Sequence, residues 1–241
     1  MAQKVLEATY SGRIYNSNDN WDTLRVASLG TVDVNGYLSC YTYMDAVETF
    51  WLHRNFLIFD TSSISADDTI TSVSLSLYCI YEAGAGTRTL GLVQTTQASD
   101  GTLVADDYDQ MGTVEGASRI KVDSYPSWKT WSLNSVYFSW INTSGSTKLG
   151  IRTWHDLDND PPDYSGEGEY TKAQFAGYNN YYYPTYLPKL IINHFPIVTQ
   201  PLGFLQGQRK PGGFLTGLKQ ESKSDMIRKP GGFLGGSKKA Q

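Results

Sequence analysis

Alternation of apolar and polar side chains with a period of two constrains the fold of this chain more than any other feature. Over residues 72–81, one face made of Val73, Leu75, Leu77, Cys79 and Tyr81 alternates with serine, tyrosine and isoleucine on the other. Side chains on a β-strand point to opposite faces in turn, so this stretch is expected to form a strand with one strongly apolar face.

Two further stretches support a β-rich chain. Residues 37–44 alternate in the same way and carry a row of tyrosines on the face opposite their apolar side chains. Residues 51–59 are almost continuously apolar, as expected of a central strand that is covered on both sides. Gly, Asn, Asp and Ser clusters separate such stretches. Further strands are expected at residues 4–10, 23–28, 87–95, 130–133, 148–154, 170–175 and 189–195.

One short helix is expected at residues 135–141, with Asn134 as its N-cap, because the Asn side chain can accept a hydrogen bond from a free first-turn amide. Many short strands with turn residues between them predict an all-β, jelly-roll-like antiparallel sandwich over residues 1–195. A domain of this size buries an ample core without a metal or a disulfide. Cys40 and Cys79 are interpreted as small buried core residues, a disulfide between them being the alternative.

The strand pattern ends at Pro196, where the composition turns to Gly, Lys, Pro and Ser. Residues 195–241 hold eight Lys and Arg against two Asp and Glu, a net charge of +6, whereas residues 1–194 carry −10. A segment of this composition buries too little apolar surface to fold alone, and such a charge split marks an interaction tail. Residues 196–241 are therefore expected to form an extended basic arm without regular structure.

The arm contains three copies of the motif Pro-x-Gly-Phe-Leu, in QPLGFLQG, KPGGFLTG and KPGGFLGG. Its prolines are spaced unequally, and stacked solenoid repeats need a fixed period. Pro and Gly favour a turn, and a Phe-Leu pair can fill a pocket on a partner. Three linked copies also raise the effective concentration of the docking groups. The predicted docking residues are Pro201, Phe204, Leu205, Pro211, Phe214, Leu215, Pro230, Phe233 and Leu234.

Three other interpretations of the arm remain open. The Phe-Leu pairs could pack on the protein's own sandwich, or the arm could be a disordered linker. A basic tail could also bind nucleic acid, but the cations are dispersed and the centre of each motif is apolar, which argues against that interpretation.

A tyrosine-rich loop near the end of the sandwich is a candidate ligand site. Aromatic faces with neighbouring Asn side chains can stack on sugar rings and hydrogen-bond to them, while structural packing or a subunit interface is the alternative. The candidate stacking residues are Tyr181, Tyr182, Tyr183 and Tyr186.

An acidic loop resembles a calcium loop in its spacing of carboxylates, which would come from Asp156, Asp158 and Asp160. Pro161 occupies the position where such a loop needs Gly for its sharp turn. A solvated acidic loop between strands is therefore the preferred interpretation, and neither a metal nor a cofactor is expected.

The sequence offers no recognisable catalytic site. His53, His155 and His194 are isolated and match no metal-ligand spacing. Patterns of a nucleophile elbow, a phosphate loop or a Cys-His pair are also missing, so the chain is predicted not to be an enzyme. Neither a membrane span nor a signal peptide is recognisable, which predicts synthesis in a host cytoplasm.

Several landmarks, in order along the chain, resemble the DNRLRE-type domains. They are NFLIFDTSSI at residues 55–64, DTITSVSLSLY at 68–78, SWIN at 139–142, LGIR at 149–152 and LPKLII at 187–192. The resemblance covers most of residues 1–194 and none of the arm. It implies a jelly roll similar to carbohydrate-binding modules, found on bacterial surface proteins, on secreted proteins and in phage genomes, with no catalytic residues to carry over.

Together these features predict a structural accessory protein of a phage particle, in the role of a capsid decoration or cement protein. Its arm would dock on another virion protein, such as the major capsid or tail protein, and the protein would be located in the virion. The alternative is a carbohydrate-binding or adhesion module at a cell or virion surface, with glycans as partners. A homo-oligomer is compatible with either function.

Deleting residues 196–241 is expected to leave a folded, soluble domain that no longer joins particles, because the arm carries all three docking motifs. Circular dichroism and particle co-purification measure the two effects. Normal incorporation of the truncated protein into particles would contradict the docking hypothesis.

Overall fold

The computed structural model describes residues 1–83, 89–123, 125–163 and 171–197. The arm motifs, and with them all the predicted docking residues, lie outside the described residues. The strands are β1 (Ala2–Glu7), β2 (Tyr10–Asn18), β3 (Thr31–Asp33), β4 (Tyr37–Met44), β5 (Phe50–Asp60), β6 (Thr69–Ala83), β7 (Thr89–Thr95), β8 (Met111–Glu115), β9 (Ile120–Lys121), β10 (Ser127–Ser132), β11 (Ser146–Thr153), β12 (Thr171–Ala176) and β13 (Lys189–Phe195). The short helices are α1 (Trp21–Arg25), η1 (Ala105–Asp109), η2 (Ser135–Trp140) and α2 (Trp154–Asp158).

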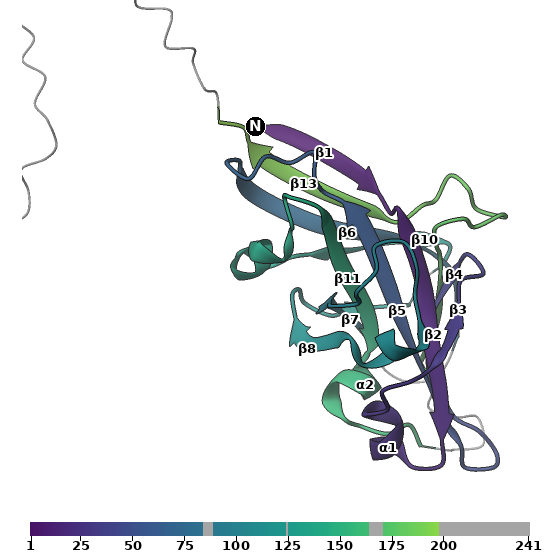
Figure 1. Cartoon of the computed structure of the whole chain (residues 1–241). Helices are drawn as coiled ribbons and strands as arrows, with labels where there is room; N and C mark the ends of the chain where they lie inside the picture. Colours follow the sequence, from purple (N-terminus) through teal and green to yellow (C-terminus); the bar gives the residue numbers. More distant parts are fainter. Residues whose placement is uncertain (84–88, 124, 164–170, 198–241) are drawn as a thin grey trace, which may run out of the picture. The chain divides into compact units, whose positions relative to one another are not determined.

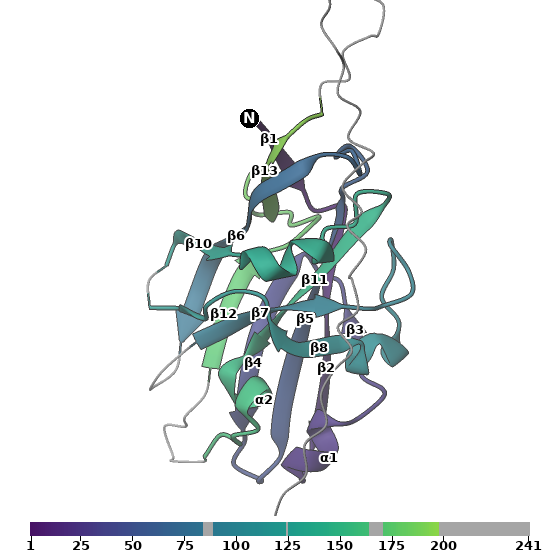
Figure 2. The ribbon, with the colours of Figure 1, turned by 90° about the vertical axis from the view of Figure 1, so that its left-hand side faces the viewer.

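The strands confirm the predicted antiparallel, sandwich-like β fold (Figure 1). They follow the order β1-β13-β6-β12-β4-β5-β11-β7-β8, with β10 on β6, β2 and β3 beside β5, and β9 on β7. Figure 2 shows α1 and α2 together near one end of the folded sheet. A first core fills the space between the layers, with side chains such as Leu38, Leu75, Leu92, Trp131 and Phe175.

Strand β5 is covered on both faces, as its continuous apolar sequence predicts. Leu57 and Phe59 belong to the first core, whereas Leu52 and Phe56 belong to a second core on the opposite face of the strand. At the edge opposite β2, the partner of β5 changes from β4 to β11. Asn55 lies at this change of partner, and its side-chain amide donates to the Ser39 carbonyl oxygen at 3.1 Å.

The second core corrects one sequence-based expectation. Residues 23–28 were expected to form a strand, but α1 occupies Trp21–Arg25 and buries Trp21 and Leu24 against β2 and β5. Asn20 caps this helix, because its side-chain oxygen accepts a hydrogen bond from the Thr23 amide at 2.8 Å. The local cap and the apolar cover that it provides outweigh the strand propensity of Thr and Val.

The helix expected at residues 135–141 is the 3₁₀ helix η2, over Ser135–Trp140. Asn134 does not cap it through its side chain. Instead its backbone amide donates to the Gly116 carbonyl oxygen at 2.8 Å, which ties η2 to the segment after β8. The other short helices, α1, η1 and α2, add to the single helix expected from the sequence.

Both cysteines are buried in the first core as free thiols. Burial raises the pKa of Cys40 well above its usual value and raises the pKa of Cys79 to about 11. Both thiols therefore stay protonated near neutral pH, in agreement with the expectation of small core residues.

The expectation of a solvated acidic loop is also wrong, because this segment contains α2 and its first acid, Asp156, is fully buried. Two guanidinium groups hold the Asp156 carboxylate, from Arg54 at 2.9 and 3.0 Å and from Arg152 at 2.7 Å to each oxygen. Burial alone would raise the pKa of Asp156, but the attraction and the hydrogen bonds of Arg54 and Arg152 hold that pKa well below its ordinary value.

The same arginines join three further segments. Arg54 donates to the carbonyl oxygens of Tyr108 and Arg25, both at 2.9 Å, and Arg152 donates to the Gly112 carbonyl oxygen at 2.8 Å. Arg25 in turn donates to the Asp156 carbonyl oxygen at 3.0 Å. We call Arg25, Arg54, Arg152 and Asp156 the buried ion cluster; it links β5 and β11 to α1, η1, β8 and α2.

The Asp156→Asn variant is expected to lower the free energy of unfolding by about 3–5 kcal/mol, because it leaves two buried guanidinium groups without their counter-ion. The matched control is Asp158→Asn, whose half-exposed carboxylate pairs with Arg119 and contributes about 0–1 kcal/mol. Urea denaturation at pH 7 measures both variants. Equal losses in the two would contradict a structural role of the buried ion cluster.

Candidate functional site

The outer face of β4 carries the row of tyrosines that the sequence indicates. Leu38 and Cys40 point into the first core, so Tyr41 and Tyr43 lie on the opposite face of the strand. Their rings stack with centroids 4.3 Å apart and an angle of 25° between the planes. Both rings are partly exposed.

Strand pairing extends this aromatic surface across β5 and β2. Tyr43 pairs with Trp51 and Tyr15 pairs with His53, and directly paired residues share a face of the sheet. The rings of Tyr43 and Trp51 are parallel to within 6° at 5.9 Å, and those of Tyr15 and His53 stack at 5.1 Å. We call the surface formed by Tyr15, Tyr41, Tyr43, Trp51 and His53 the aromatic face.

Charged and polar side chains border the aromatic face. Lys172 of β12 places its ammonium group 5.1 Å from the ring centroids of both Tyr41 and Tyr81, within reach of a cation–π interaction. Arg13 of β2 forms an ion pair with Asp33 and also donates to the Ser39 hydroxyl. Hydrogen-bond donors and acceptors therefore both lie beside the rings.

One further polar group, the Asp45 carboxylate, fixes the ring of Trp51. The indole nitrogen of Trp51 donates to Asp45 at 3.1 Å, and the Thr49 amide donates to the same carboxylate at 2.9 Å. The bonds from Thr49 and Trp51 lower the pKa of Asp45. Trp51 is thus held in one orientation by a carboxylate that stays ionised near neutral pH.

His53 is a neutral member of the aromatic face. Burial, together with the nearby charges of Arg13 and Lys172, lowers its pKa to about 3, against the opposing effect of Asp33. Its Nδ1 atom is buried and has no hydrogen-bond partner among the described residues. At neutral pH the ring therefore acts as an uncharged stacking group.

A second aromatic group lies on the outer face of β6 and β10. Tyr78 stacks on Tyr186 with centroids 3.9 Å apart and contacts Trp128 at 5.4 Å, while Lys189 covers Trp128 at 5.0 Å. A bulge in β6 pairs Gln174 with Tyr81 and Phe175 with Cys79. Since Phe175 and Cys79 point into the first core, Tyr78 and Tyr81 both point outward, on the same face of β6. The expectation that Tyr81 lies on the apolar face with Cys79 is therefore wrong, because the bulge reverses the alternation after Cys79.

The predicted glycan-stacking residues are divided by the structure. Tyr186 belongs to the second aromatic group, and the ring centroids of Tyr183 and Tyr186 lie 6.2 Å apart. Tyr181 and Tyr182 are 88% and 72% exposed and contact one another at 5.4 Å. The loop itself is fixed by buried Asn180, which donates to the Gly36 carbonyl oxygen at 2.6 Å.

The acidic candidates are engaged in other contacts. The carboxylate of Asp156 is enclosed by the buried ion cluster, and that of Asp158 binds Arg119 at 2.5 and 2.6 Å. Asp160 is exposed and contacts His155 Nδ1 at 2.8 Å through its backbone carbonyl oxygen, not through its carboxylate. The described part of the chain contains no group of three or more His, Cys, Asp or Glu side chains placed to hold a metal ion. It also contains no helix long and apolar enough to cross a membrane.

Sequence reasoning found the tyrosines of β4 but not their partners. Trp51 and His53 follow the period of two within β5, and the signal was hidden because apolar residues occur on both faces of this strand. Tyr15 lies in β2, which was expected only as far as residue 10 because its sequence YSGRIYNSN is mostly polar. A comparison with known family models and curated proteins finds no match to this chain.

The low pKa of His53 predicts a specific pH dependence of stability. The unfolded chain binds a proton at His53 below about pH 6.5, but the folded protein does not until about pH 3. The contribution of His53 to the free energy of unfolding is therefore unaffected by pH above 6.5, and the free energy of unfolding falls between pH 6.5 and 3. His53→Phe, which keeps a ring beside Tyr15, is expected to reduce this fall in urea titrations at pH 7, 5.5 and 4. Identical pH profiles for the variant and the wild type would refute the assignment.

Proposed function

We propose that the folded domain is a non-enzymatic glycan-binding module that holds a saccharide chain along the aromatic face. One observation carries the proposal: stacked, partly exposed rings from three neighbouring strands share one face of the sheet and are bordered by Arg, Lys, Asp and Ser side chains.

The chemistry of sugars fits such a surface. A pyranose ring presents apolar C–H groups on its faces and hydroxyl groups around its edge. Tyr and Trp rings supply large, rigid contact areas for the C–H faces at a low cost in conformational entropy. Lys172, Arg13 and Asp33 lie where they can hydrogen-bond to the hydroxyl groups at the edge.

The spread of the rings favours a chain over a single small molecule. A small-molecule site is normally concave and encloses most of its ligand, whereas the aromatic face runs across β2, β5 and β4. Successive sugar units could each lie on a separate ring. An extended glycan gains affinity by adding such contacts, each weak on its own.

Trp51→Ala and Tyr43→Ala are each expected to weaken binding of a recognised oligosaccharide about tenfold, which corresponds to ~1.4 kcal/mol. The ligand is first identified on a glycan array, and isothermal titration calorimetry of the full-length variants then measures the affinities. Tyr181→Ala is the matched control, since this tyrosine is 88% exposed and contacts only Tyr182 among the described rings.

Affinity lost with Tyr181→Ala but kept with Trp51→Ala would place the glycan on the loop and refute the aromatic face. A wild-type protein that binds no glycan but self-associates, and becomes monomeric on Trp51→Ala, would identify the face as a subunit interface instead.

A second proposal concerns where the module works. The three Pro-x-Gly-Phe-Leu motifs and the +6 charge of the arm support attachment to a larger assembly. The proposed assembly is a virus particle, a phage capsid that the protein decorates, and the virion is the proposed location. The two proposals are compatible, and the deletion of residues 196–241 described above tests this one separately.

A further inference from the structure

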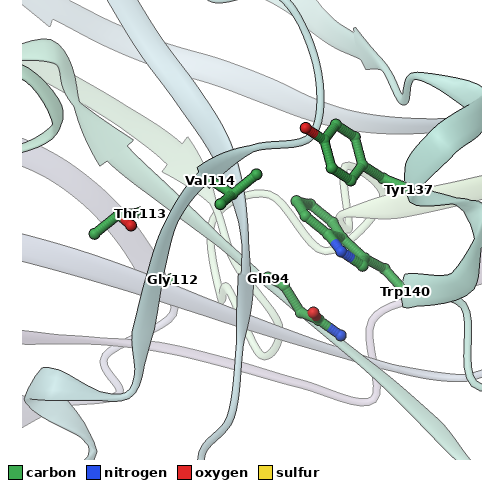
Figure 3. A pocket seen from close by; sticks show the side chains of 6 residues that line it. All are labelled: Gln94, Gly112, Thr113, Val114, Tyr137 and Trp140. Atoms are coloured by element: carbon green, nitrogen blue, oxygen red, sulfur yellow. The ribbon is translucent and has the colours of Figure 1, made fainter. Parts of the chain in front are cut away.

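A cleft lies between β8 and η2, away from the strands that form the aromatic face. Its volume is about 420 Å³, and it is lined by Gln94, Gly112, Thr113, Val114, Tyr137 and Trp140. Figure 3 shows Tyr137 and Trp140 extending from the η2 side, with Thr113 and Val114 on β8 and Gln94 on β7. The volume falls within the ~300–1,000 Å³ that is usual for small-ligand sites.

The cleft originates in an irregular pairing of β8 with β7. Val93 pairs with Glu115 and Thr95 pairs with Met111, so the single residue Gln94 faces three residues of β8. The additional residues make β8 bulge away from β7. Gly112 allows the remaining close approach, because a Cβ atom there would lie 2.9 Å from the Gln94 carbonyl oxygen.

The aromatic wall is held rigidly by the main body of the fold. Tyr137 and Trp140 pack against each other with centroids 4.8 Å apart, and both also pack against the first core. A Cβ atom at position 116 would lie 2.3 Å from the Trp140 ring, so Gly116 makes room for it. The site is therefore formed before any ligand arrives, which lowers the entropic cost of binding.

The chemistry of the lining indicates a neutral, amphipathic ligand. Two aromatic rings and Val114 supply apolar contacts, and no ionisable acid or base lines the cleft. The Gln94 amide, the Thr113 hydroxyl, the Tyr137 hydroxyl and the Trp140 indole N–H have no hydrogen-bond partner within the described structure. These groups offer both donors and acceptors next to a flat apolar wall.

We infer that this cleft is a binding site for a single neutral pyranose ring, such as the terminal unit of a glycan. The ring would stack its C–H face on Trp140 and direct hydroxyl groups to Gln94 and Thr113. This inference is independent of the proposed function, because the cleft shares no residue with the aromatic face.

The test uses the full-length protein and a panel of neutral methyl glycosides of glucose, galactose, mannose and N-acetylglucosamine. Saturation-transfer-difference NMR detects binding, and a titration followed by tryptophan fluorescence gives the affinity. At least one glycoside is expected to bind, with affinity reduced fivefold or more by Gln94→Ala and by Thr113→Val. Trp140→Phe, which keeps an aromatic ring against the core, is expected to reduce it less.

Tyr181→Ala is the matched control for the cleft and is expected to leave glycoside affinity unchanged, because this exposed tyrosine belongs to neither the cleft nor the aromatic face. Loss of glycoside binding in Trp51→Ala, with none in Gln94→Ala, would overturn the inference and assign the sugar to the aromatic face. Absence of binding by every glycoside would also overturn it. Binding of indole or N-acetylphenylalanine amide in place of sugars would do so too, since the cleft would then suit an aromatic side chain of a protein.

Discussion

The buried ion cluster is the interaction on which the arrangement of this domain depends. Two guanidinium groups, each with two hydrogen bonds, surround the Asp156 carboxylate and compensate for its complete removal from water. Arg54 lies between His53 and Asn55 on β5 and points to the face opposite His53. The cluster therefore fixes, from behind, the strand that contributes Trp51 and His53 to the aromatic face.

The sequence predicts the strands whose faces differ most in polarity. Strand β13 agrees with residues 189–195 at both ends, and β4 agrees with 37–44, because alternation makes their register unambiguous. Strand β2 was largely missed, since the Gly12 and Ser11 positions that it buries carry no apolar side chain. Helix α2 was missed for a different reason: the ions that neutralise Asp156 come from Arg54, about 100 residues away, and from Arg152.

The candidate site shows the same division between local and distant information. A tyrosine row on β4 is visible from local alternation, but its continuation through Trp51 and Tyr15 depends on which strands pair and in what register. The cleft beside η2 depends on a bulge that pairs one residue of β7 with three of β8. Neither the partner strand nor the bulge has a signal in the local sequence, so both surfaces require the three-dimensional structure.

The two surfaces suit different parts of a glycan. The aromatic face extends over three strands and is bordered by charges, which fits internal units of a chain, whereas the cleft of about 420 Å³ is uncharged, which fits one ring at a chain end. Both are built from rings that the sheet or the core holds in place, so binding requires little ordering of the protein.

An NMR titration of the aromatic side-chain signals of the full-length protein, with an oligosaccharide selected on a glycan array, tests the central claim most directly. The account predicts that the ring signals of Tyr41, Tyr43, Trp51 and Tyr15 shift together and saturate, while those of Tyr181 and Tyr182 stay in place. Saturable binding of the oligosaccharide without any change in the four ring signals of the aromatic face would contradict it.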